Sequence, residues 1–191
     1  MTPAEQARAA FAALAALASR VAEQHAADIA RLAALYVATL RGGGTLWFAG
    51  NGGSAADAQH AAAEYVVRYG KSRRALPAVA LTTDTSLLTA CGNDLGFEAI
   101  FARQVEALAR PGDLLVLHST SGQSPNVVRA AQAARAKGVR VVALLGKDGG
   151  ALHRVVDDSL VIPADETSHI QELQLAVEHV ICAIVETELK L

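Results

Sequence analysis

The chain of 191 residues has few cysteines, few aromatic residues and no concentration of positive charge. Its two cysteines, Cys91 and Cys182, form no CxxC pair, which excludes a disulfide framework and is typical of a reducing compartment. The 17 Lys and Arg residues are balanced by 19 Asp and Glu residues, so no basic block is present to neutralise a nucleic-acid backbone. The composition therefore argues against a disulfide-rich scaffold and against a nucleic-acid-binding protein.

Long uninterrupted apolar stretches are also missing. Charged residues interrupt each apolar stretch before the roughly 20 residues that a membrane-spanning helix requires. The first eleven residues, MTPAEQARAAF, have neither the basic start nor the apolar centre of a signal peptide. Because 52% of the residues are hydrophobic and 19% are charged, the chain can bury a substantial core. We expect a folded cytoplasmic protein with one domain overall.

Residues 3–41 are predicted to be helical. Thr2, Pro3 and Glu5 form the pattern of a capping box with proline at the first helical position. Apolar residues then recur every three or four positions in two stripes, one before and one after the polar residues 23–25. Those polar residues indicate either a break between two helices or a solvated turn of one helix. The stripes consist of Phe11, Leu14, Leu17 and Val21, followed by Ile29, Leu32, Leu35, Tyr36 and Leu40.

After the glycines at 42–44, short apolar runs alternate with longer amphipathic segments. This alternation predicts parallel strands joined by crossover helices, and hence an α/β fold with a three-layer αβα sandwich and a five-stranded parallel sheet. Residues 1–41 would be a helical segment that packs in an oligomer, and residues 42–191 would form the α/β domain. The predicted strands are 45–49, 78–81, 114–118, 139–145 and 160–162, and the predicted helices are 54–69, 97–109, 124–137, 149–155 and 168–190.

In open α/β sheets, ligands bind beyond the carboxyl ends of the strands. The loop 50–54, Gly-Asn-Gly-Gly-Ser, follows the first strand, and its glycines allow close approach of a ligand to a helix N-terminus. The loop has neither the GxGxxG spacing of a dinucleotide site nor the GK[ST] of a P-loop. On its own it is equally well explained as a tight turn with Ser54 capping the helix.

The loop 119–124, Ser-Thr-Ser-Gly-Gln-Ser, follows the third predicted strand and is more specific. Its four hydroxyls, together with the free N–H groups of the next helix, can bind a phosphate dianion without lysine or arginine. A turn that merely caps its helix explains one or two hydroxyls better than four. The context of strand, loop and helix therefore favours phosphate.

These two motifs, GNGGS and STSGxS, resemble those of the sugar isomerase (SIS) domain family, and the likeness extends over nearly all of residues 35–190. The long N-terminal helical segment also resembles the phosphoheptose (sedoheptulose-7-phosphate) isomerase branch, whose fold is flavodoxin-like. The resemblance implies that the hydroxyl loop holds the sugar phosphate and that two further groups line the sugar chain. The implied phosphate ligands are Ser119, Thr120, Ser121 and Ser124, and the implied sugar contacts are Asn51, Gly52, Gly53, Asn93 and Asp94.

Four chemistry-bearing residues lie on two predicted helices. His60 and Glu64 stand four residues apart and Gln171 and His179 eight apart, so each pair lies roughly on one helix face. Taken by themselves, His60 and Glu64 also fit a surface ion pair, and His179 also fits a buried core or interface histidine. Together, two imidazoles, a carboxylate and an amide oxygen suit a zinc site, whereas Glu64 and His179 also suit proton transfer. The resemblance implies one zinc per subunit on all four residues, Glu64 and His179 as the acid/base pair, and Glu64 and Gln171 as substrate contacts too.

Three residues depart from the pattern of the branch that the chain resembles. His169 stands where an arginine is expected, and Gln174 stands where a histidine is common. Neither change removes a proposed ligand, but both can alter how Gln171 is oriented. His118 replaces an apolar residue, and we expect it to be a strand-end histidine without a catalytic role.

The resemblance implies an aldose–ketose isomerase that interconverts sedoheptulose 7-phosphate and D-glycero-D-manno-heptose 7-phosphate through an enediol(ate), for bacterial lipopolysaccharide or surface-saccharide synthesis. The apolar N-terminal helix predicts self-association, and the resemblance implies a homotetramer. The chain also resembles the non-enzymatic replication-initiator-associating regulators of the same fold, but it keeps Glu64, which argues for an enzyme. A sugar-sensing module is disfavoured because no DNA-binding segment is present, and an isomerase for another sugar phosphate remains an alternative.

Overall fold

The sheet of the protein has five strands, all parallel, in the order β2-β1-β3-β4-β5. A computed structural model describes all residues from Met1 to Leu191. The strand order is that of the flavodoxin-like fold, and the predicted fold class is therefore confirmed. The strands are β1 (Leu46–Ala49), β2 (Ala78–Ala80), β3 (Leu114–Ser119), β4 (Arg140–Gly146) and β5 (Asp158–Ile162).

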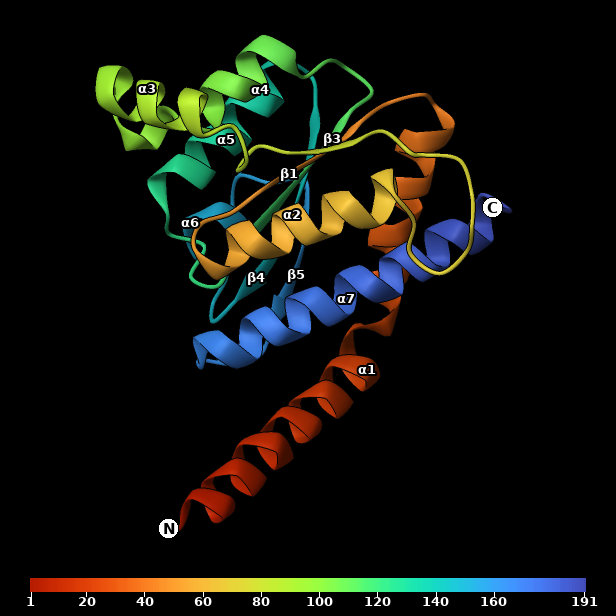
Figure 1. Ribbon diagram of the computed structural model, residues 1–191, viewed down its shortest axis with the longest axis vertical. Coiled ribbons are helices and arrows are strands. Elements are labelled where there is room, and N and C mark those ends of the chain that lie inside the picture. Colours follow the sequence, from red (N-terminus) through yellow and green to blue (C-terminus); the bar gives the residue numbers. More distant parts are fainter.

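Helices cover both faces of this sheet (Figure 1). Successive strand residues point to opposite faces, so Leu46 and Phe48 join the core beneath α1, α2 and α7, while Trp47 and Ala49 join the core beneath α3 to α6. This double burial explains why the strands read as continuous apolar runs. The helices are α1 (Pro3–Arg41), α2 (Gly53–Val66), α3 (Thr85–Leu95), α4 (Ala102–Leu108), α5 (Pro125–Ala136), α6 (Gly150–His153) and α7 (Thr167–Glu188), with a 3-10 turn η1 (Phe97–Ala99).

The helix α1 is continuous over 39 residues, so the polar residues 23–25 are a solvated turn and not a break. Its capping box is formed as predicted, because the Thr2 hydroxyl accepts from the Glu5 N–H and the Glu5 carboxylate accepts from the Thr2 N–H. From Leu17 onward the helix contributes buried residues to the core, whereas residues 3–16 contain no buried residue and project from the body of the molecule (Figure 1). Phe11 in this projecting segment is 74% exposed.

Two segments differ from the sequence prediction. Helix α3 was not predicted, although Asp84 caps it by accepting from the Leu87 N–H at 2.9 Å. The helix predicted over 97–109 is divided into η1 and α4. The chain buries four consecutive residues, 99–102, at the division. Consecutive residues of an α-helix point about 100° apart, so one helix face cannot bury all four, and the turn residues Ile100 and Phe101 separate η1 from α4.

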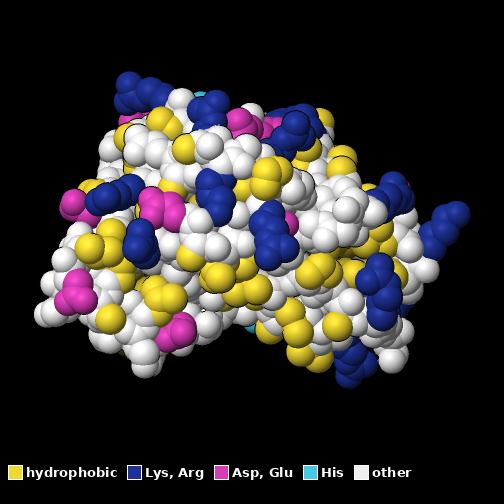
Figure 2. Space-filling model, turned by 90° about the horizontal axis from the view of Figure 1, so that it is seen from above, with side chains coloured by type: hydrophobic (Ala, Val, Ile, Leu, Met, Phe, Trp, Pro, Cys, Tyr) yellow, Lys and Arg dark blue, Asp and Glu magenta, His cyan; other side chains and the backbone are white.

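None of the helices combines the length and the hydropathy that a bilayer crossing requires. On the face seen in Figure 2, the Lys and Arg side chains are dispersed among acidic and apolar residues and form no continuous basic patch. On this face the distribution agrees with the balanced composition.

Candidate active site

The glycine loop after β1 brings α2 close to α7. Gly52 is the N-cap of α2 and has φ +57, a conformation that glycine adopts without strain. A Cβ on Gly53 would lie 2.6–2.8 Å from the Gln171 amide, so glycine leaves room for Gln171 to approach this turn. Helix α2 therefore starts at Gly53 and not at Ser54, and Ser54 is free to face the site.

Asn51 in this loop is held by Asn126, the second residue of α5. Each side-chain amide donates to the carbonyl oxygen of the other, at 2.9 and 2.8 Å. Asn126 is 2% exposed, and its Oδ1 also accepts from the Val127 N–H at 3.0 Å. The pair joins the loop after β1 to the helix after β3, which are the two connections that flank the topological switch point of the sheet.

A polar cavity of about 90 Å³ lies at this switch point. Hydroxyls and amides line it, and no lysine or arginine reaches it. Ser124 caps α5 with its backbone but makes no side-chain capping bond, so its hydroxyl is available to a ligand at the helix N-terminus. The lining residues are Asn51, Ser54, His118, Ser119, Thr120, Ser121, Ser124 and Gln171.

The hydroxyl loop is held in shape by its own hydrogen bonds. The Gly122 N–H donates to the Ser119 hydroxyl at 3.0 Å, and the Gln123 N–H donates to the Ser121 hydroxyl at 3.2 Å. Gly122 has φ +61, and a side chain there would approach the Gly149 carbonyl oxygen to 1.9 Å. The loop is thus pressed against the start of α6 and presents a preformed surface to an anion.

His60, Glu64 and His179 form a second group farther along α2 and α7. One ligand atom from each lies within 4.8 Å of the others. The Nε2 atoms of His60 and His179 are 2.8 Å apart, and His60 Nε2 is 3.4 Å from Glu64 Oε1. The three side chains are partly exposed, so both solvent and substrate can reach them. The predicted convergence of Glu64 and His179 is therefore present within a single chain.

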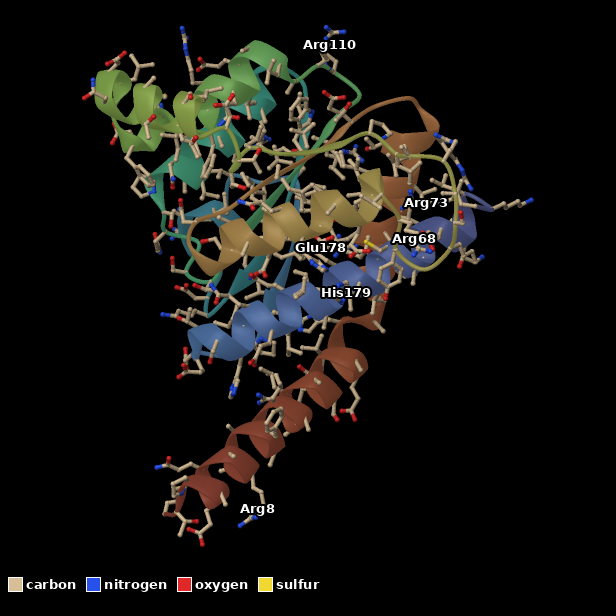
Figure 3. The ribbon with its side chains drawn as sticks, in the orientation of Figure 1. Arg8, Arg68, Arg73, Arg110, Glu178 and His179 are labelled. Atoms are coloured by element: carbon tan, nitrogen blue, oxygen red, sulfur yellow. The ribbon has the colours of Figure 1, made fainter.

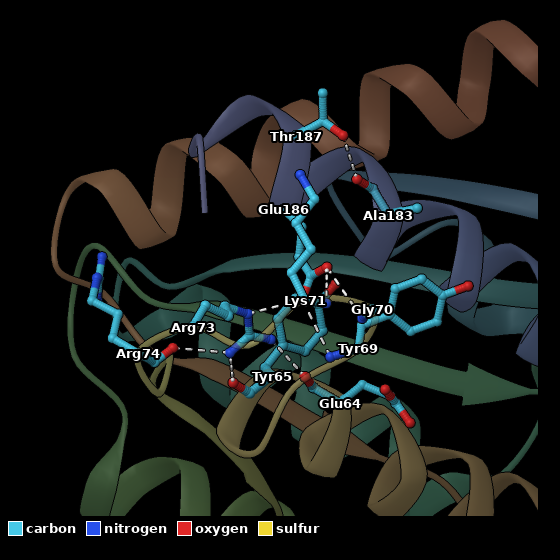
Figure 4. Close-up of polar contacts among 10 residues, drawn as sticks. All are labelled: Glu64, Tyr65, Tyr69, Gly70, Lys71, Arg73, Arg74, Ala183, Glu186 and Thr187. Carbon is cyan, nitrogen blue, oxygen red and sulfur yellow. Dashed lines mark hydrogen bonds and ion pairs between the residues drawn. The ribbon is translucent and has the colours of Figure 1, made fainter.

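Tyr69 and a buried ion pair support this second group. The Tyr69 ring stacks on the His179 ring with centroids 5.6 Å apart. Figure 4 shows how the chain around Tyr69 is held: the N–H groups of Tyr69, Gly70 and Lys71 donate to the Glu186 carboxylate, and Arg73 Nε donates to it at 3.0 Å. Arg73 also donates to the Glu64 carbonyl oxygen at 2.7 Å.

A buried polar network lies behind the two groups. Glu178, which precedes His179 on α7 (Figure 3), accepts from the Tyr36 hydroxyl at 2.9 Å and pairs with His118 Nε2 at 3.0 Å. His118 Nδ1, Glu178 Oε2 and Asp57 Oδ2 are buried without a partner. Burial raises the pKa of Asp57, while the charges of His118 and His60 act to lower it. Asp57 therefore lies within electrostatic reach of both histidines.

The predicted site residues fall into three places. Gln171 lies in the polar cavity, eight residues before His179, while His60, Glu64 and His179 form the other group. Asn93 and Asp94 do not line the cavity; they are exposed on α3, where the Asn93 amide donates to Asp94 at 2.7 Å. Sequence reasoning missed Ser54 and Asn126 as parts of the site. Ser54 belongs to the glycine motif, but Asn126 gave no signal.

Comparisons with known proteins agree with this geometry. The sequence profile of the SIS domain matches residues 11–146. The phosphoheptose isomerase of Akkermansia muciniphila is 52% identical over 164 residues, which are 86% of this chain and 87% of the relative. The phosphoheptose isomerase of Rhodospirillum rubrum is 54% identical over 161 residues, 84% and 86% of the two chains.

Solved structures give the same result. The phosphoheptose isomerase of Neisseria gonorrhoeae has a TM-score of 0.91 and 41% identity, and the match covers 97% of this chain and 100% of that one. The phosphoheptose isomerase of Francisella tularensis has a TM-score of 0.94 and 35% identity, with 98% and 100% covered. This chain belongs to the SIS domain family and, within it, to the phosphoheptose isomerases.

Proposed function

We propose that the protein interconverts sedoheptulose 7-phosphate and D-glycero-D-manno-heptose 7-phosphate, with Glu64 and His179 as the acid/base pair. The observation that carries the proposal is the convergence of the Glu64 carboxylate and two imidazoles along the same two helices that border the hydroxyl-lined cavity. An aldose–ketose isomerisation needs one group to remove a proton and another to polarise or protonate an oxygen, and this pair supplies both.

The spacing of the two groups supports a long sugar phosphate. Gln171 borders the cavity and His179 belongs to the acid/base group, and eight residues of helix separate them by about 12 Å. A substrate whose phosphate occupies the hydroxyl loop must therefore extend over several carbon atoms before its carbonyl reaches Glu64. This geometry favours an open-chain heptose phosphate over a three-carbon substrate.

In the proposed reaction, the hydroxyls of the loop 119–124 and the N-terminus of α5 hold the phosphate dianion. One member of the Glu64–His179 pair removes a proton from the carbon next to the carbonyl, and the other donates a hydrogen bond or a proton to the carbonyl oxygen. The former carbonyl carbon then accepts a proton while the hydroxyl on the neighbouring carbon gives one up, so that the neighbouring carbon becomes the new carbonyl. Asn51 and Gln171 line the path between phosphate and carbonyl and bind the sugar hydroxyls.

We also propose that His60, Glu64 and His179 hold zinc. Two imidazole nitrogens and a carboxylate oxygen within 4.8 Å of one another are a donor set that suits this ion. Gln171, the fourth predicted ligand, lies against Gly53 and the cavity and is better placed to contact the sugar. Zinc, when bound, supplies a Lewis acid that polarises the substrate carbonyl.

The working form that we propose is a cytoplasmic homotetramer. The projecting segment of α1 exposes Phe11 to solvent in the single chain, and association through this helix would cover it. Cys91 and Cys182 are buried as free thiols, which suits a reducing compartment. The product would enter synthesis of the heptose units of lipopolysaccharide or another surface saccharide.

The test is an assay with sedoheptulose 7-phosphate in D₂O, followed by NMR of the sugar. We expect an aldose product that carries solvent deuterium at the carbon next to its carbonyl, because the enediol exchanges its proton with the pair. Glu64→Gln and His179→Gln should each lower kcat by 10²- to 10⁴-fold while leaving the circular dichroism spectrum unchanged. Glu106→Gln, an exposed change on α4, is the matched control and should leave the rate unchanged.

Full turnover by Glu64→Gln would remove this carboxylate from the mechanism. Absence of any product or exchange from the wild-type protein would favour the regulator alternative, which has the same fold. Retention of Glu64 beside His179 argues for the enzyme.

A further inference from the structure

The imidazole ring of His179 needs a partner that fixes its plane. The torsion that turns a histidine ring about its Cβ–Cγ bond has a broad energy profile, so a partly exposed histidine on a helix has several ring orientations of similar energy. His60 meets this ring at its edge, with the planes 65° apart and the Nε2 atoms 2.8 Å apart. A contact at one ring atom restrains the position of that atom more than the plane of the ring.

Tyr69 supplies a restraint on the plane. Its ring stacks on the His179 ring with centroids 5.6 Å apart and planes 30° apart. Tyr69 belongs to the connection after α2, so the ring carried by α7 is covered on one face by a residue from a different element. Two stacked aromatic rings favour a defined relative orientation. The stack therefore limits the turning of the imidazole that the helix itself allows.

The backbone that carries Tyr69 is anchored to the same helix as His179. The N–H groups of Tyr69, Gly70 and Lys71 donate to the Glu186 carboxylate at 3.1–3.2 Å (Figure 4). Glu186 follows His179 by seven residues, which is close to two helical turns, so both side chains leave α7 on the same side. Glu186 is also 4% exposed, so these bonds are shielded from water. The Tyr69 ring is thus placed against His179 by a fixed segment of backbone.

We propose that Tyr69 is a positioning residue for the isomerisation: its ring holds the His179 imidazole in the plane from which it exchanges a proton with the substrate. The proposal rests on the proposed function, in which Glu64 and His179 are the acid/base pair. Proton transfer needs donor and acceptor aligned within hydrogen-bond reach, and a misplacement of about 1 Å can lower a rate about 10²-fold. Because Tyr69 acts through His179, its loss should affect kcat more than KM.

The kinetic test compares Tyr69→Leu with the conservative variant Tyr69→Phe in the full chain, with sedoheptulose 7-phosphate as substrate. Leucine removes the ring but keeps the backbone N–H that bonds to Glu186, and because Tyr69 is 38% exposed the change opens no large cavity in the core. We expect Tyr69→Leu to lower kcat about 10- to 100-fold, with KM changed less than about threefold. Tyr69→Phe keeps the ring and should restore kcat to within about threefold of wild type.

Val67→Ala is the matched control for a general loosening of this connection, because Val67 is an exposed residue in the same segment. Its kcat should equal that of wild type. A loss of kcat in Val67→Ala as large as that in Tyr69→Leu would refute a specific role of the ring, and so would an equal loss in Tyr69→Phe.

NMR of protein with labelled histidine and tyrosine measures the stack directly, with the His179 signals assigned through His179→Gln. A stacked ring changes the chemical shifts of its neighbour. The His179 ring signals should therefore match in wild type and Tyr69→Phe, and should move in Tyr69→Leu toward those of a histidine without a stacked ring. A His179 ring whose signals are the same in all three proteins would refute the proposal.

The remaining outcomes are also decisive. Full turnover by Tyr69→Leu would refute the positioning role and leave the proposed function intact. Absence of turnover in wild type would refute the proposed function itself, and the role of Tyr69 in it. If Tyr69→Leu does not fold, wild type decides: nuclear Overhauser contacts between the Tyr69 and His179 rings support the proposal, and their absence overturns it.

Discussion

Arg73 and Glu186 form a buried ion pair that ties the chain after α2 to the last turns of α7 (Figure 4). The two side chains are 2% and 5% exposed, and Nε and Oε1 are 3.0 Å apart. Because Arg73 also donates to the Glu64 and Tyr65 carbonyl oxygens, the pair positions the end of the helix that carries Glu64. A contact far from the cavity thus holds the acid/base group in place.

The first prediction concerns this pair. Glu186→Ala would leave the Arg73 guanidinium buried without its counter-ion, so the free energy of unfolding should fall by about 3–5 kcal/mol. Chemical denaturation measures the change. The exposed pair Arg103–Glu106 is the control, and Glu106→Ala should cost less than about 1 kcal/mol. Equal costs for the two variants would contradict the positioning role.

The same carboxylate predicts a dependence on pH. Burial acts to raise the pKa of Glu186, but the N–H groups of Gly70 and Tyr69 and the Arg73 guanidinium together lower it below its usual 4.5. A depressed pKa in the folded state adds stability above the unfolded value of 4.5, and that stability is lost as the pH falls through the folded value. Thermal unfolding below pH 4.5 should therefore depend less steeply on pH in Glu186→Gln than in wild type.

The second prediction compares two glycines with positive φ. Gly43, at φ +80, has no atom within 4 Å of an added Cβ, whereas at Gly122, at φ +61, the Cβ would meet the Gly149 carbonyl at 1.9 Å. Gly43→Ala should cost about 1–2 kcal/mol of stability from backbone strain alone. Gly122→Ala should cost at least twice as much and weaken phosphate binding, because the hydroxyl loop must move. If urea denaturation gave the two variants similar losses in the free energy of unfolding, the hydroxyl loop would be able to move without a large cost in stability.

The third prediction concerns the reciprocal amides of Asn51 and Asn126. Asn126→Leu leaves the Asn51 side-chain amide without its partner, while the Val127 N–H keeps its bond to the Ser124 carbonyl oxygen, and the change should cost about 1–3 kcal/mol. The double variant Asn51→Leu/Asn126→Leu also removes the unpaired Asn51 amide. Its loss in the free energy of unfolding should therefore be smaller than the sum of the losses in the two single variants. A double-mutant cycle in urea measures this coupling. Strict additivity would mean that the amides act independently.

The fourth prediction tests zinc at the group of His60, Glu64 and His179. An ion that binds only the folded chain raises its stability by about 2.7 kcal/mol at a concentration one hundred times its Kd. Chelator-treated protein should therefore melt at a higher temperature after zinc is added. His60→Ala should abolish that shift, while His153→Ala, an exposed histidine on α6, should retain it. A shift that survives His60→Ala would place the ion elsewhere.

Much of this protein could be read from local patterns. The capping box at Thr2, the apolar runs of the strands and the hydroxyl loop 119–124 depend on neighbouring residues, and each was predicted in place. The same holds for His60 and Glu64, because four residues along a helix bring two side chains together whatever the rest of the fold does.

Contacts between distant segments were decided only by the tertiary structure. His179 meets His60 across 119 positions, and Asn51 meets Asn126 across 75, because parallel strands place their carboxyl ends at one edge of the sheet. The sequence alone could not show that Gln171 lies beside the polar cavity or that Asn93 and Asp94 lie outside it. Nor could it show that His118 pairs with Glu178 in the core. Such pairings depend on how helices pack over the sheet, and local periodicity carries no information about that packing.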